Sequence, residues 1–532
     1  MNNKPYAWRV IKQMSNISNN LPSDVQPSLH EAAEKQSGRI TQTELENYLW
    51  GAAILLRGVI DAGDYKQFIF PLLFFKRLSD VHEEEYRAAL SESGGDASYA
   101  AFAENHRFQI PEGAHWRDVR QATKNVGDKL QNAMREIERA NADKLYGIFG
   151  DAQWTNKNRL SDETLLDLIE HFSALTLSIE NVPEDELGIA YEFLIKKFAD
   201  DSGHTAAEFY TNRTLVHLMT LMLEIKSDDS VYDPTCGSGG MLLSAVAEIK
   251  RQGREFRTMR LYGQERNLMT SAIARMNLFL HDIEDFRIER GDTLSEPKLL
   301  DTDRLKQFDA VLANPPYSIK QWNRKAWESD AFGRNFLGVP PQGRADYAFF
   351  QHILKSLKPE TGRCAILFPH GVLFRNEEAA MRRKLIETDA IECVLGLGAN
   401  LFYNSPMEAC VIICRSTKPE ERRGKILFIN AVDEVTRERA QSFLTEANQA
   451  KILDVYRNFA DKEDFSRVVL LDEIRAKDGN LNIPLYIRKT VANGNAAQNE
   501  NSLAEAIAEW EQSSINLRGA MNELFTTLEQ NI

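Results

Sequence analysis

Residues 231–243 read VYDPTCGSGGMLL, a short apolar strand that leads into a glycine-rich turn and then a helix. Glycine adopts positive φ at little cost and lets a ligand approach the backbone, and the N-terminus of the next helix offers free N–H donors. A glycine-rich turn alone is weak evidence, but Asp233 at the end of the strand would direct a carboxylate toward a ligand. The stretch predicts an α/β fold with a site beyond this strand.

Short apolar or β-branched runs alternate with amphipathic helices after Ser230. The expected strands are residues 230–233, 260–265, 286–292, 309–314, 363–368, 391–397 and 409–415. Strands separated by segments of helical length predict a mainly parallel sheet with helices on both faces. Ligands bind such sheets beyond the carboxyl ends of the strands, so the site is expected there.

Acidic residues close three consecutive strands of this series. Asp233 ends the first, Glu265 ends the second in YGQE, and Asp292 ends the third in RGDTL. An acid at the second position can accept hydrogen bonds from two ribose hydroxyls, and one at the third could accept from an adenine amino group. One such acid is unremarkable, but three in succession after a glycine-rich turn predict a ligand that contains adenosine.

The fourth strand runs into residues 308–317, FDAVLANPPY. Two prolines fix the backbone of the turn, which we expect to leave the Asn314 amide and the Pro315 carbonyl projecting into the cleft. Two oxygens held side by side form a double acceptor for a planar NH2 group. Tyr317, after Pro316, supplies a flat face for the ring that carries this group. The turn therefore predicts recognition of an aromatic amine.

These motifs together resemble the signature of S-adenosylmethionine-dependent amino methyltransferases, D-P-x-x-G-x-G followed by N-P-P-[YF]. Their order is similar to that in the modification (M) subunit of type I restriction-modification systems, and residues 45–80, 346–353 and 362–374 also match. Residues 208–213, EFYTNR, resemble the cofactor motif of that subunit, [EQ]-[FY]-[FY]-T-P-R. Asn212 replaces the usual proline and is expected to cap the following helix.

The resemblance implies a Rossmann-like methyltransferase domain that transfers a methyl group from S-adenosylmethionine to the N6 amine of adenine in double-stranded DNA. The target base would be flipped out of the duplex and stacked between Tyr317 and Phe402. The implied catalytic residues are Asn314, Pro315, Pro316 and Tyr317. The implied cofactor-binding residues are Glu208, Phe209, Tyr210, Thr211, Asn212, Arg213, Asp233, Ser238, Gly239, Gly240, Glu265 and Asp292. No metal is expected.

The implied partners, besides DNA, are a specificity (S) subunit, a second M subunit and, in the full complex, a restriction (R) subunit. The chain is acidic, with 64 Lys and Arg against 78 Asp and Glu. Because unaided DNA binding usually needs a basic surplus, we expect a local basic patch or a partner chain to supply it.

Four segments are expected along the chain. Residues 1–42 form a polar leader, residues 43–200 a helical domain, residues 201–488 the catalytic domain, and residues 489–532 a linker and a C-terminal helix. Ser502 and Glu505 form a capping box at the start of this last helix. Its heptad stripe from Leu503 to Leu528 suits docking on a partner or folding back on its own domain.

The five cysteines are an odd number spread through a large chain, which argues against a disulfide framework. No apolar run reaches the length of a membrane span, and the N-terminus lacks the apolar core of a secretion signal. A cytoplasmic protein is therefore expected, with no membrane partner.

Two other functions are compatible with the motifs. N-P-P-Y also occurs in enzymes that methylate a glutamine amide in proteins, and the double acceptor does not distinguish the two planar amines. A degenerate methyltransferase fold kept as a scaffold is the second alternative, which the intact acids and the N-P-P-Y turn disfavour.

Overall fold

The computed structural model describes residues 40–201, 211–399, 401, 408–437 and 442–487. The chain divides into two compact units at Ile487, and the second unit, residues 488–532, lies outside the described residues. The expected leader, up to residue 39, and the C-terminal heptad helix also lie outside them.

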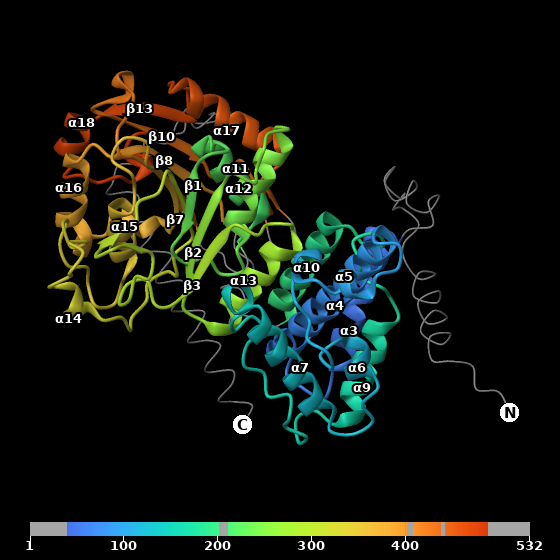
Figure 1. Ribbon diagram of the computed structural model, residues 1–532. Helices are drawn as coiled ribbons and strands as arrows, with labels where there is room; N and C mark the ends of the chain where they lie inside the picture. The colour runs from blue at the N-terminus through green and yellow to red at the C-terminus, as the bar shows by residue number, and fades with distance from the viewer. Residues whose placement is uncertain (1–39, 202–210, 400, 402–407, 438–441, 488–532) are drawn as a thin grey trace, which may run out of the picture. The chain divides into compact units, whose positions relative to one another are not determined.

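Helices make up the first part of the described chain (Figure 1). Those in the N-terminal part are α3 (Gln42–Leu55), α4 (Lys66–Glu92), α5 (Ala97–Ala100), α6 (Trp116–Arg120), α7 (Val126–Ala140), α8 (Ala142–Leu145), α9 (Asp162–Ser173) and α10 (Glu184–Asp201). Thr41 and Glu44 form a capping box that starts α3. Although α4 is 27 residues long, no helix among the described residues is both long and apolar enough to cross a membrane.

Helix α13 (Leu268–Leu280) belongs to the sheet region but packs into the core of these N-terminal helices. Met269, Ile273, Met276 and Phe279 are buried there, and the Tyr191 hydroxyl of α10 donates to the Ile273 carbonyl at 3.3 Å. The helical region and the sheet therefore share a helix within one compact unit.

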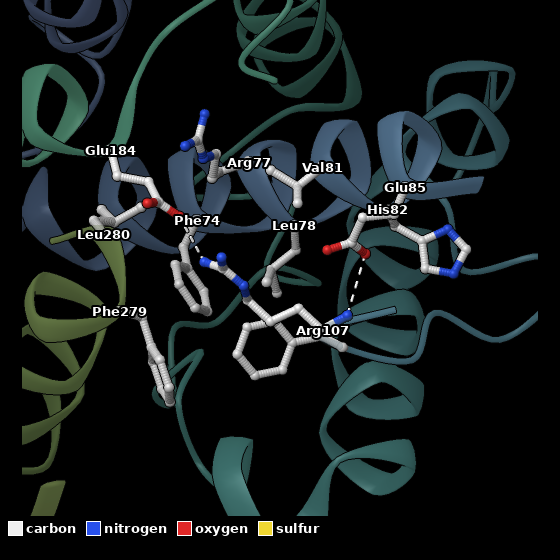
Figure 2. Close-up of a pocket in the computed structure, with 11 residues that line it drawn as sticks. Phe74, Arg77, Leu78, Val81, His82, Glu85, Arg107, Glu184, Phe279 and Leu280 are labelled. Atoms are coloured by element: carbon white, nitrogen blue, oxygen red, sulfur yellow. Dashed lines mark hydrogen bonds and ion pairs between the residues drawn. The ribbon is translucent and has the colours of Figure 1, made fainter. Parts of the chain in front are cut away.

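A pocket lies where α4 meets the end of α13, and it is lined by none of the predicted site residues that the structure describes. Figure 2 shows Phe74 and Phe279 at its apolar side. Arg107 reaches Glu184 at 2.6 Å there, and its backbone N–H donates to Glu85. The charged residues Arg107, Glu184 and Glu85, which line this pocket, are thus paired with one another.

The large sheet has nine strands in the order β13-β10-β8-β9-β7-β6-β1-β2-β3. Their bounds are β1 (Ser230–Asp233), β2 (Arg260–Glu265), β3 (Phe286–Arg290), β6 (Ala310–Ala313), β7 (Arg363–Pro369), β8 (Ile391–Leu397), β9 (Ala409–Arg415), β10 (Lys425–Ala431) and β13 (Ser466–Leu470). The run from β7 to β3 is parallel, and β8 is parallel to β10. Strand β9 is antiparallel to both its neighbours, and β13 is antiparallel to β10.

All seven expected strands are present, although two of them are shorter than expected. Strand β3 stops at Arg290, so Asp292 lies two residues past its end, and β6 spans only Ala310–Ala313. Strands β10 and β13 were not expected. Two small hairpins, β4 (Leu300–Asp301) with β5 (Arg304–Leu305) and β11 (Thr436–Arg437) with β12 (Ser442–Phe443), complete the strands of the described chain.

Successive strand residues face opposite sides of the sheet, because the side-chain period of a strand is two. Val231 packs on one side with α11 (Arg213–Leu223), α12 (Gly240–Arg251), α13 and α17 (Glu446–Asn458). Tyr232 packs on the other side with α15 (Asp346–Lys355), α16 (Ala379–Glu387) and α18 (Leu471–Ala476). The short α14 (Arg324–Trp327) lies between β6 and α15 in sequence.

The chain changes direction across the sheet between β1 and β6. It passes from β1 outward to β2 and β3, then returns to pair β6 with the opposite side of β1, with Val231 opposite Ala310. A crevice forms at such a switch point, beyond the carboxyl ends of the two strands. Asp233, which ends β1, and Asn314, which follows β6, therefore flank the same crevice.

Candidate active site

A cleft opens at this switch point. Six residues expected in the site line it together, and they are Thr211, Arg213, Asp233, Ser238, Gly240 and Asn314. They come from the start of α11, the end of β1, the glycine-rich turn and the end of β6. Side chains far apart in sequence thus converge on one cleft.

The glycine-rich turn has the backbone that its sequence predicts. Gly237 and Gly239 have φ of 53° and 83°, in the left-handed region that glycine tolerates best. Helix α12 starts at Gly240, where a Cβ atom would overlap the Arg213 guanidinium. Ser238 is buried, and its carbonyl accepts a hydrogen bond from the Asn277 amide at 2.9 Å. The turn therefore depends on glycine for its backbone conformation at Gly237 and Gly239 and for a close approach at Gly240.

Each of the three predicted acids accepts a hydrogen bond from the backbone N–H two residues further on. Asp233 accepts from Thr235 and Asp292 from Leu294, both at 2.9 Å. Glu265 accepts from Asn267 at 2.8 Å with one oxygen and from Gly237 at 3.2 Å with the other. Glu265 therefore joins the end of β2 to the glycine-rich turn.

Asp292 is not among the residues that line the cleft. Its second carboxylate oxygen lies 3.9 Å from the exposed Arg266 guanidinium. Its position past the end of β3 places it farther along the turn than expected. A role in adenine recognition stays a prediction.

Asp233 is almost completely buried, and burial raises its pKa to about 7. The Thr235 N–H lowers this pKa and the nearby Glu265 carboxylate raises it further. A buried carboxylate becomes more stable as an anion when positive charge approaches. The end of β1 is therefore suited to a cationic ligand.

The Asn314 amide is oriented by partners at both ends. Its Nδ2 donates to the Thr211 hydroxyl at 3.0 Å, and its Oδ1 accepts from the Tyr317 hydroxyl at 2.8 Å. The Thr235 hydroxyl donates to the Asn314 carbonyl at 3.3 Å and so links β1 to the turn after β6. An amide oxygen has two lone pairs, so Oδ1 keeps one for a further donor.

The prolines and the tyrosine of this turn differ in exposure. Pro315 is buried, Pro316 is exposed, and Tyr317 is half-buried with its ring against the core that also contains α11 and α12. Burial raises the pKa of the Tyr317 hydroxyl, which keeps it protonated and able to donate to Asn314.

Asn212 caps α11, as its substitution for proline predicts. Its side-chain oxygen accepts from the backbone N–H of Thr214 at 3.0 Å and of Leu215 at 3.4 Å, and the helix begins at Arg213. Its φ of −54° is one that proline also adopts, so the two residues fit the same backbone. Arg213 forms an ion pair with Glu192 of α10.

Four predicted site residues lie outside the described residues, and they are Glu208, Phe209, Tyr210 and Phe402. The cleft also contains residues that the sequence did not single out, which are Val216, Thr235, Cys236, Gly237 and Met241. All but Val216 belong to the stretch VYDPTCGSGGMLL. These four residues could have been predicted by including the whole stretch in the site. All five cysteines are buried and free, as expected.

The chain matches two models of protein families. The N-6 DNA Methylase model covers residues 182–494, and the HsdM N-terminal domain model covers residues 45–172. The first match takes in more than half of the chain. Its range contains both the cleft and the large sheet. Neither the protein-glutamine alternative nor the scaffold alternative is favoured by these matches.

Relatives and solved structures agree with these matches. The type I restriction enzyme MjaVII methylase subunit of Methanocaldococcus jannaschii is 32% identical over 88% of this chain and 81% of its own length. The crystal structure of the type I restriction-modification system methyltransferase subunit from Streptococcus thermophilus superposes with a TM-score of 0.72 and 31% identity, over 84% of this chain and all of that one.

A modification subunit of a putative type I restriction enzyme from Vibrio vulnificus shares the fold, with a TM-score of 0.62 and 19% identity over 82% of this chain and 93% of that one. The expected α/β methyltransferase fold with N-terminal helices is confirmed. The chain belongs to the N-6 DNA methylase family, among the methylase subunits of type I restriction enzymes.

Proposed function

We propose that the cleft between β1 and β6 is the place where this DNA methylase binds S-adenosylmethionine and methylates the N6 amine of adenine. The observation that carries the proposal is the Asn314 amide, fixed between Thr211 and Tyr317 at the switch point. An oriented amide oxygen beside the cleft is the acceptor that a planar NH2 group needs.

The cleft fits the cofactor in charge and backbone. Asp233 would face the positive charge of the ligand, and Glu265, at the end of β2, would hold the ribose hydroxyls. Arg213, packed over Gly240, would pair with the carboxylate of the methionine part of the cofactor. The rest of the cofactor motif would also contribute to cofactor binding, through Glu208, Phe209, Tyr210, Thr211 and Asn212.

When bound, S-adenosylmethionine supplies an electrophilic methyl group on a sulfonium. The amine of adenine is a poor nucleophile because its lone pair is delocalised into the ring. Asn314 Oδ1 and the Pro315 carbonyl would accept both amine hydrogens, favour a pyramidal nitrogen and align it for attack. The nitrogen loses a proton readily once it is methylated, so no strong base is required before the transfer.

The target adenine must leave the duplex to reach this turn. Tyr317 would provide one face of the stack and Phe402 the other, with Pro316 fixing the exposed side of the turn. Because the Tyr317 hydroxyl donates to Asn314, the base-stacking ring and the amine acceptor would move as one group.

In this proposal the chain acts in the cytoplasm with an S subunit, a second M subunit and, in the full complex, an R subunit. Its net charge of −14 favours DNA binding that relies on a partner chain. Residues 489–532 would dock on the S subunit through the heptad stripe, and residues 43–200 and 201–488 would be the helical and catalytic domains.

The test offers radiolabelled S-adenosylmethionine to DNA, with and without a co-purified S subunit, and digests the DNA to nucleosides. The proposal expects label in N6-methyldeoxyadenosine, with more label when the partner is present. Label only in protein, or in a methylated cytosine, would contradict it.

A further inference from the structure

Ser318, directly after Tyr317, has a φ of 51°, in the left-handed region. A non-glycine residue is strained there and keeps this conformation only when its surroundings hold it. Its backbone N–H donates to Asp346 Oδ1 at 2.9 Å. Asp346 is the first residue of α15 and is buried. A carboxylate from a distant helix thus holds the strained end of the N-P-P-Y turn.

The other oxygen of Asp346 accepts from Arg375 Nη1 at 2.7 Å. The Arg375 side chain is 17% exposed and that of Asp346 is 1% exposed, so the pair is largely shielded from water. Breaking one side of such a pair leaves an uncompensated buried charge. Asp346 is therefore fixed by Arg375 on one side while it fixes Ser318 on the other.

The absence of a side chain at Gly371 leaves the space that the Arg375 guanidinium occupies. A Cβ atom on Gly371 would overlap Nε, Cζ and Nη2 of Arg375, and the φ of Gly371 is not in the left-handed region. An alanine there would fit the backbone and still displace the guanidinium. The position of Arg375 can thus be changed without removing any charge.

We propose that Asp346 and Arg375 are positioning residues for methyl transfer, which hold the turn after Tyr317 so that the Tyr317 hydroxyl and the Asn314 amide keep their mutual orientation. This inference rests on the proposed function of that turn. Neither side chain lines the cofactor cleft, so their loss should slow the transfer without weakening S-adenosylmethionine binding.

Asp309 offers a matched control, because it lies at the start of β6 whereas the N-P-P-Y turn follows the end of that strand. It precedes β6 and is also buried, and it accepts from the Ser230 N–H at 2.9 Å and from Lys358 at 2.7 Å. It therefore has the same two kinds of partner as Asp346, a backbone N–H and a cation, but it lies at the end of β6 that is remote from Asn314. Changing Asp309 tests what the loss of such a carboxylate does to the fold alone.

The experiment measures kcat and KM for DNA methylation by the full chain with its S subunit, the S-adenosylmethionine Kd by calorimetry, and the thermal midpoint. Asp346→Asn, Arg375→Met and Gly371→Ala should each lower kcat by about 10- to 100-fold and leave the cofactor Kd within about twofold of wild type. Arg375→Lys should recover part of the loss. Asp309→Asn should lower the thermal midpoint and leave kcat unchanged.

Two results would overturn the inference while leaving the proposed function intact. One is wild-type kcat in Gly371→Ala and Arg375→Met. The other is a loss of kcat in Asp309→Asn as large as in Asp346→Asn, because the effect would then be general destabilisation. A wild-type enzyme that methylates no DNA would overturn the proposed function, and this inference with it.

Discussion

The Asn314 side chain donates a hydrogen bond to the hydroxyl of Thr211, a residue 103 positions earlier in the chain. Thr211 belongs to the segment that resembles a cofactor motif, and Asn314 to the turn expected to accept the amine. The two motifs, which the sequence presents separately, are therefore one hydrogen-bonded unit. The orientation of the amine acceptor depends on the cofactor side of the cleft.

Thr211→Val tests this dependence. Valine keeps the shape of threonine but removes the acceptor for Asn314 Nδ2, so the amide should lose its fixed orientation. We expect kcat to fall by about 5-fold, the effect of losing one hydrogen bond of about 1 kcal/mol. Steady-state methylation assays provide the measurement. A valine variant with wild-type kcat would show that the Thr211 hydrogen bond does not orient the acceptor.

Gly240→Ala tests the contact between the glycine-rich turn and Arg213. A Cβ atom at this position would overlap the guanidinium, which must then leave its place beside the cleft. We expect the S-adenosylmethionine Kd to rise by about 10-fold or more, as measured by calorimetry, because a charge-assisted contact contributes about 1.5–3 kcal/mol. Gly63→Ala is the control, since a Cβ there meets no atom within 4 Å in the described part of the chain and the φ is not left-handed. Equal affinity in the two variants would argue against a role for Arg213.

Glu378 predicts a pH dependence of stability. Both its carboxylate oxygens are buried without a hydrogen bond to any residue that the structure describes. Burial raises its pKa to about 7 despite the neighbouring Arg375, Arg344 and Arg382, and Asp346 raises it further. The folded state therefore binds this proton more tightly than the unfolded state, whose pKa is about 4.5. The free energy of unfolding should consequently fall as pH rises from about 4.5 to about 7.

Glu378→Gln should remove this contribution and be more stable than wild type above pH 7, by about 1–3 kcal/mol. Denaturant unfolding at several pH values measures the difference. Asp233 contributes a slope of the same sign in both proteins, so the comparison isolates Glu378. Glu377→Gln, at the exposed neighbouring residue that pairs with Arg344, is the control. A Gln variant with the wild-type pH profile would refute the assignment.

Much of the sheet was predictable from local sequence, because its strands are apolar runs bounded by polar residues. The bounds of β1, β2, β8 and β9 match the expected ranges. Strand β10, KILFINA, has the same kind of run and was missed. Strand β13 is short and, among the described strands, pairs with β10 alone, so its local signal is weak. The antiparallel direction of β9 follows from a connection to β8 that is too short for a helical crossover.

The site was predictable where strand ends create it and not where distant side chains meet. Asp233, Glu265 and Asn314 stand at or beside strand ends, and parallel strands bring those ends to one edge. Asp292 was misplaced because β3 stops early at Arg290. Asp346 starts α15 and Arg375 follows β7, so their pairing depends on how these two parts of the chain pack together, which no local sequence pattern predicts.

The most direct test of the account compares wild-type protein with Asn314→Ala, each with its S subunit, DNA and radiolabelled S-adenosylmethionine. We expect wild type to place the label on N6 of adenine, and Asn314→Ala to lose transfer by about 100-fold or more while its cofactor Kd stays within a few-fold of wild type. Methylation of adenine by Asn314→Ala at the wild-type rate would contradict the account.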